Sequence, residues 1–60
     1  MTTKYLVVWG IATVYRMKDR VLECAPLSKD NTFYEGEFQP VYVTSLFTEA
    51  DMMNVAELLK

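Results

Sequence analysis

The sequence contains no histidine and one cysteine, Cys24, among its 60 residues. Histidine is the side chain most often used as a general base and as a metal ligand, so its absence removes the usual route to both kinds of site. A single cysteine can form no intramolecular disulfide and cannot supply the paired thiolates of a zinc site. The chain has two glycines and no glycine-rich phosphate loop. We therefore expect a protein that is not an enzyme and that has no metal or other cofactor.

A strong excess of charge of either sign is also absent. Charged residues make up 23% of the chain and the net charge is −2, which disfavours non-specific adhesion to nucleic acid or to an anionic membrane. The longest apolar run, residues 5–17, is shorter than the roughly 20 residues that a membrane-spanning helix needs. A lone cysteine is typical of a reducing compartment. These features predict a cytoplasmic protein without membrane contact.

The small size of the chain predicts one domain, residues 1–60. A domain of this length buries only about 60% of the surface that its unfolded chain exposes. Small domains are usually helped by disulfides, a metal or oligomerisation. Because the composition argues against the first two, the sequence favours association with a second copy or with another protein.

The run from Tyr5 to Met17 is rich in β-branched and aromatic residues, and it predicts one long strand. Both faces of such a strand would be apolar, so that one face would need cover from outside the chain. We expect the helix to lie over the face of Leu6 and Val8 and a partner to meet the face of Trp9, although the reverse assignment remains open. Gly10 predicts a bend, a bulge or a close approach of another group.

The remaining pattern predicts the other elements of a small α+β domain. Lys18-Asp19 indicates a tight hairpin turn. It is followed by a second strand over 20–27, a loop over 28–31, a short extended piece over 32–35 and a last strand over 38–47. Thr48 and Asp51 form a capping box, and an apolar stripe follows it, so a C-terminal helix begins there. The expected fold class is an antiparallel sheet of three or four strands with this helix packed on one face.

Two groups of residues are candidates for binding another protein. Tyrosine and tryptophan commonly anchor interfaces, and several lie on one face of the predicted long strand. Aromatic and acidic residues also surround Gly36. The candidate partner-binding residues are Tyr5, Val7, Trp9, Ile11, Tyr15, Tyr34, Glu35 and Glu37. Cys24, in contrast, is interpreted as a buried apolar residue, as free cysteines usually are.

A different function is suggested by Arg16, Lys18 and Arg20 at the tip of the predicted hairpin. Side chains two residues apart in a strand share a face, so these charges are able to converge on phosphate. A solubilising hairpin tip explains the same pattern. Our main hypothesis is a protein-binding module, acting as a homodimer or as a small inhibitor or adaptor of a larger protein. The alternative is a small nucleic-acid-binding regulator that uses this hairpin.

Overall fold

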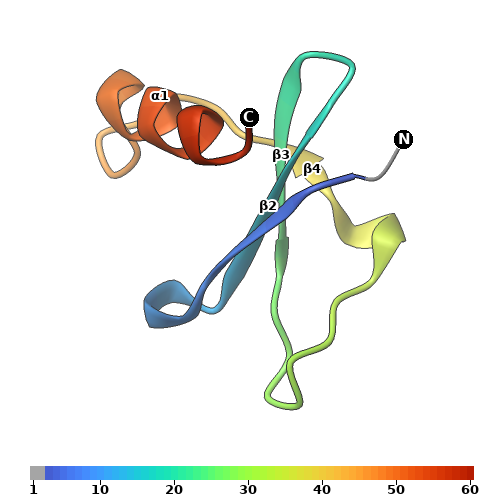
Figure 1. Cartoon of the computed structure of the whole chain (residues 1–60). Coiled ribbons are helices and arrows are strands. Elements are labelled where there is room, and N and C mark those ends of the chain that lie inside the picture. The colour runs from blue at the N-terminus through green and yellow to red at the C-terminus, as the bar shows by residue number, and fades with distance from the viewer. Residues whose placement is uncertain (1–2) are drawn as a thin grey trace.

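A computed structural model describes residues 3–60, which fold into a four-stranded antiparallel sheet and one C-terminal helix (Figure 1). This architecture confirms the predicted small α+β class. The strands follow one another across the sheet in the order β1-β2-β3-β4. The elements are β1 (Tyr5–Val8), η1 (Trp9–Ile11), β2 (Thr13–Lys18), β3 (Val21–Pro26), η2 (Glu35–Glu37), β4 (Gln39–Pro40) and α1 (Glu49–Leu58), where η denotes a 3₁₀-helix.

The predicted single strand over 5–17 is wrong, because the chain reverses direction at η1. Ala12 takes a left-handed conformation with φ of 48°, and β1 then pairs back on β2, with Val8 opposite Thr13. The reversal resets the alternation of side chains. Tyr15 lies opposite Leu6 in this register, so it shares the face of Leu6 and not that of Tyr5.

The second hairpin turns one residue later than predicted. Its two turn residues are Asp19 and Arg20, with φ of 52° and 68°, and β3 begins at Val21. Positive φ at both central residues characterises the type I′ turn, whose twist suits a two-residue hairpin. Asparagine and glycine are the usual residues there, and Asp-Arg carries a steric cost that Asn-Gly does not.

The predicted last strand is much shorter in the structure. Only Gln39 and Pro40 pair with β3, and the backbone N–H of Val41 still donates to the carbonyl of Leu22. Further along, the Thr44 hydroxyl accepts hydrogen bonds from two backbone N–H groups, at Leu46 and Phe47. Such side-chain bonding competes with a ladder, so residues 41–47 form a loop. The predicted extended piece at 32–35 is not a strand either.

The helix begins where the sequence predicts. The backbone N–H of Asp51 donates to the Thr48 hydroxyl at 3.3 Å, and the backbone N–H of Thr48 donates to the Asp51 carboxylate at 3.0 Å. The reciprocal pair completes the capping box. No helix in residues 3–60 is long and apolar enough to cross a membrane.

The core under α1 lies on the face of the sheet that was expected to receive the helix. Tyr15, Leu22 and Leu59 are buried there, and half-buried apolar residues pack against them: Leu6, Val8, Cys24, Val41, Phe47, Met52 and Val55. None of the residues of α1 itself is buried, since Leu59 follows its last residue. The helix is therefore attached through a narrow line of contacts.

The opposite face of the sheet is covered by the chain after β3. Val14 and Ala25 are cross-strand partners on that face and are almost completely buried. Tyr5 contacts the rings of Phe33 and Phe38, with centroids 5.0 and 6.1 Å away. Figure 1 shows α1 and the η2 segment on opposite sides of the sheet. Residues of the chain itself thus pack against both faces of the sheet, which the sequence did not suggest.

Candidate functional site

The structure divides the predicted partner-binding residues among three places. Trp9 and Ile11 lie together in the exposed turn η1. Tyr5 and Glu35 are joined by a hydrogen bond of 2.8 Å on the face away from α1, where Tyr34 and Glu37 are also exposed. Tyr15 is in the core. The residues therefore do not form one surface.

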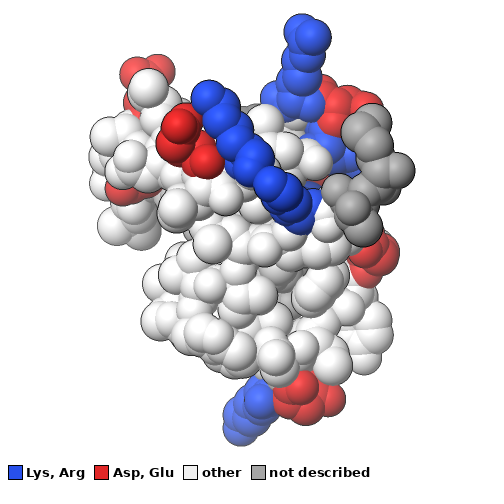
Figure 2. Space-filling model, viewed as in Figure 1, with Lys and Arg blue, Asp and Glu red and all other residues white. Residues whose placement is uncertain are grey.

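Large apolar side chains are exposed in η1 and in the loop before α1, and we define Trp9, Ile11 and Leu46 as the Trp9 patch. Their exposed fractions are 62%, 60% and 94%. Beside Ile11 and Leu46 lies a shallow cleft, which is lined by Val8, Ile11, Tyr15, Leu46, Phe47, Asp51, Asn54 and Val55. Figure 2 shows an uncharged surface over β1 and η1, consistent with the absence of any charged residue between Lys4 and Arg16.

Leu46 was not among the candidates, because residues 38–47 were predicted to form a strand. In the structure it projects from the loop that Thr44 organises. The sequence shows Leu46 as a large aliphatic residue in the turn between Thr44 and the helix cap at Thr48. That signal indicates exposure only when the strand is known to end at Pro40.

Two of the predicted residues of the long strand are not exposed. Tyr15 is buried and stacks on Phe47 with ring centroids 5.9 Å apart, so it forms the floor of the cleft and not a free anchor. Burial raises the pKa of its hydroxyl. Val7 is half-buried and lies opposite the buried Val14. The reversal at η1 moved Tyr15 to the face of Leu6, whereas Val7 stays on the face of Tyr5, which the chain after β3 covers.

On the other face, Arg16 is held by two carboxylates and an aromatic ring. Its Nε donates to Glu23 at 2.9 Å, its Nη1 donates to Glu35, and its guanidinium carbon lies 3.8 Å from the centre of the Phe38 ring. Arg16 as a whole residue is only 8% exposed. We call Tyr5, Arg16, Glu23, Glu35 and Phe38 the Arg16 cluster.

The electrostatics of the Arg16 cluster keep its charges in place. The hydrogen bond from Tyr5, and then the one from Arg16, lower the pKa of the Glu35 carboxyl, and the same bond to Glu35 raises the pKa of Tyr5. Burial lowers the pKa of Arg16, but its hydrogen bonds to Glu23 and Glu35 outweigh that effect and raise it. At neutral pH, the ion pairs of Arg16 with Glu23 and Glu35 link β2 to β3 and to η2.

This arrangement buries Arg16, although Arg16 and Lys18 line one hollow together with Tyr5 and Glu35. Arg16 would have to leave both carboxylates and the Phe38 ring before it could bind a phosphate. Lys18 and Arg20 are exposed at the hairpin tip, where nothing comparable holds them.

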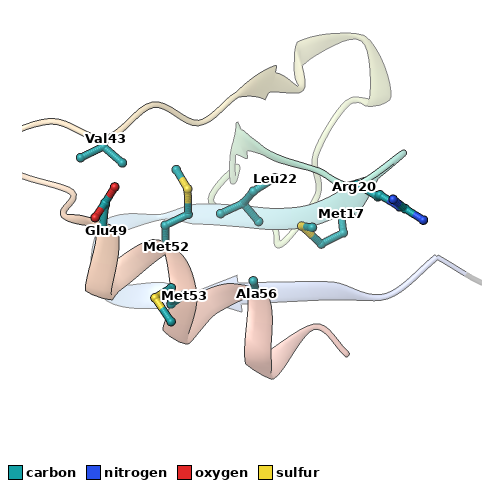
Figure 3. Close-up of a pocket in the computed structure, with 8 residues that line it drawn as sticks. All are labelled: Met17, Arg20, Leu22, Val43, Glu49, Met52, Met53 and Ala56. Carbon is teal, nitrogen blue, oxygen red and sulfur yellow. The ribbon is translucent and has the colours of Figure 1, made fainter.

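A second apolar hollow lies between the tip of the β2–β3 hairpin and α1 (Figure 3). We call it the methionine groove. Its volume is about 420 Å³, and it is lined by Met17, Arg20, Leu22, Val43, Glu49, Met52, Met53 and Ala56. The groove could not be predicted from the sequence because three separate segments form it. The Met52-Met53 pair, in the segment predicted to be helical, was its visible signal.

The described residues offer little for metal binding or covalent chemistry. No group of three or more histidine, cysteine or acidic side chains lies close enough to hold a metal within residues 3–60. Cys24 is half-buried in β3, and burial raises the pKa of its thiol. Because the thiolate is the reactive form, this environment makes Cys24 a poor nucleophile.

Comparison of the chain with models of protein families, with curated proteins and with solved structures finds no match.

Proposed function

We propose that this chain is a non-enzymatic protein-binding module and that the Trp9 patch is a surface with which it binds. The observation that carries the proposal is the exposure of Trp9, Ile11 and Leu46, of which Ile11 and Leu46 line one cleft and Trp9 lies with Ile11 in η1. Tryptophan is among the residues most enriched at the energetic centres of interfaces. Exposed apolar residues that lie together, rather than scattered singly, mark sites of association.

The partner of the Trp9 patch is a larger protein, toward which the chain acts as an inhibitor or adaptor. The floor of the cleft supports this proposal, because Tyr15 and Phe47 are already stacked there and lose little freedom when an apolar side chain settles on them. We place the protein in the cytoplasm, since a lone half-buried thiol suits a reducing compartment.

A cross-linking experiment in the native host tests the proposal. A photoreactive phenylalanine analogue at position 46 is expected to capture one protein. The same analogue at Lys29, an exposed loop position, is the control and should not capture it. Trp9→Ala should weaken binding of the captured protein by about thirtyfold, corresponding to about 2 kcal/mol. Equal capture from both positions, or binding unchanged by Trp9→Ala, would contradict the proposal.

The alternative of a nucleic-acid-binding regulator rests on Lys18 and Arg20, which are exposed together at the hairpin tip. Phosphate contacts make such binding fall steeply with salt. Filter binding of DNA and RNA at two salt concentrations, with the wild type and with Lys18→Ser/Arg20→Ser, distinguishes the two functions. Salt-sensitive binding that the double variant loses would favour the alternative.

A further inference from the structure

The methionine groove has opposite charges at its two ends. Figure 3 shows Arg20 at one end and Glu49 at the other, with Met17, Leu22, Met52, Met53 and Ala56 between them. Within residues 3–60, neither charged side chain forms an ion pair or a hydrogen bond with another residue. The groove is therefore an apolar surface with a positive charge at one end and a negative charge at the other.

The walls of the groove are only partly covered by the chain itself. Met53 is 72% exposed, and Val43 and Met17 are also exposed. Methionine side chains are flexible and polarizable, so they adapt to an opposing apolar surface. The adjoining helix has no buried residue of its own. A molecule bound on this side would contact apolar side chains of α1 and of the hairpin that the chain itself leaves exposed.

The backbone conformation at Arg20 fixes where its side chain begins. Arg20 has φ of 68° as the second residue of the type I′ turn between β2 and β3. Here the side chain places a positive charge at the mouth of the groove.

We propose that the methionine groove binds the same groove of a second copy of this chain, around a two-fold axis that passes through its middle. This axis runs perpendicular to the length of the groove, so it exchanges the two ends. Arg20 of each copy then faces Glu49 of the other, while the apolar strips meet between them. An interface of this kind is self-complementary, as the isologous contacts of homodimers are.

The opposite charges at the two ends of the groove favour a second copy of the chain as its binding partner. A groove with the same charge at both ends would repel its own copy under this symmetry, whereas Arg20 and Glu49 attract theirs twice. The inference goes beyond the binding proposed for the Trp9 patch, because it concerns a different surface. A dimer formed in this way leaves Trp9 free for another protein.

Two charge-reversal variants test the pairing by sedimentation equilibrium, with circular dichroism to verify that each remains folded. Arg20→Glu and Glu49→Arg should each weaken self-association at least tenfold, because like charges then meet at both ends. An equimolar mixture of the two variants should associate to within about threefold of the wild type, because both contacts become attractive again. Lys29→Glu makes the same charge change as Arg20→Glu at an exposed loop and should have no effect.

The measurement also separates this inference from the function proposed for the Trp9 patch. Trp9→Ala should leave the self-association constant unchanged while it weakens binding of the larger partner. A wild type that stays monomeric at millimolar concentration would overturn the inference, as would single variants that associate normally or a mixture that does not recover. Self-association lost in Trp9→Ala but kept in the charge variants would place the second copy on the Trp9 patch instead.

Discussion

The two faces of the sheet are closed in different ways. On one face, the Arg16 cluster joins β2, β3 and the η2 segment through ion pairs, a hydrogen bond and an aromatic ring. On the other, α1 lies over Tyr15 and Leu22 but buries no residue of its own and leaves the methionine groove open. A chain this small completes one face from within and leaves the other in need of contacts, which is where a partner gains most.

The largest effect should come from the apolar face. Leu59→Ala removes the buried side chain that follows the last residue of α1. It should lower the free energy of unfolding by about 2.5 kcal/mol, near the lower limit for such truncations because a chain end can relax. Leu58→Ala is the matched control, since Leu58 is 69% exposed. Urea unfolding measures both. Similar midpoints for the two variants would mean that α1 is not anchored through Leu59.

The Arg16 cluster should contribute slightly less. Arg16→Ala leaves Glu23 without its cation and removes the guanidinium from Phe38, so we expect a loss of about 2 kcal/mol. The cost is smaller than for a fully buried pair because Glu35 is largely exposed. Lys18→Ala, two residues along the same strand face and exposed, should change stability by less than about 0.5 kcal/mol. A loss as small as that of Lys18→Ala would show that the cluster does not close this face.

The helix cap offers a smaller test of how firmly the helix face is held. Thr48→Ala removes the hydroxyl that accepts from Asp51 and should cost about 1 kcal/mol. Ser45→Ala, an exposed loop position three residues before the cap, should be neutral. The comparison again uses urea midpoints. If Thr48→Ala shifted the midpoint no more than Ser45→Ala, the capping box would not limit the stability of the helix face.

Low pH should weaken the face that carries the Arg16 cluster, and this is the smallest of the four expected effects on stability. The lowered pKa of Glu35 means that its carboxylate stabilises the fold above its usual pKa of about 4.3, and that this stabilisation is lost as the pH falls through the lower folded-state value. Glu35→Gln should therefore lower stability at pH 7 and make no difference at the acid end of the titration. Glu37→Gln is the control. A difference that persists at low pH would assign the effect of Glu35 to packing.

The sequence was sufficient wherever one short segment determines the structure. Thr48 and Asp51 are three residues apart, so the start of the helix could be predicted from a local motif. Gly10 predicted a bend, a bulge or a close approach, but the turn at Trp9, Gly10 and Ile11 has none of the polar residues that usually accompany a reversal, so the predicted strand continued through it. The error changed the face assigned to Tyr15 and hid its burial.

The surfaces were harder to predict than the elements. Arg16 is partnered by Glu23 from the next strand and by Glu35 from a distant 3₁₀-helix, and no spacing in the sequence reports such contacts. The methionine groove likewise exists only once the β2–β3 hairpin, the loop at Val43 and α1 are in place. Trp9 and Ile11, in contrast, were chosen as candidates from residue type, and both are exposed in the structure, although the strand predicted to carry them does not exist.

The order of the strands has a kinetic consequence. Each strand pairs only with its neighbours along the chain, so the sheet can assemble by successive short loop closures with little loss of chain entropy. The hairpin of β2 and β3 closes the shortest loop and shares the Arg16–Glu23 pair, so we expect it to organise the transition state, with α1 joining afterwards. In stopped-flow experiments, Leu22→Ala should then slow folding, whereas Thr48→Ala should mainly accelerate unfolding. The reverse pattern would make the helix, and not the hairpin, the nucleus from which this chain folds.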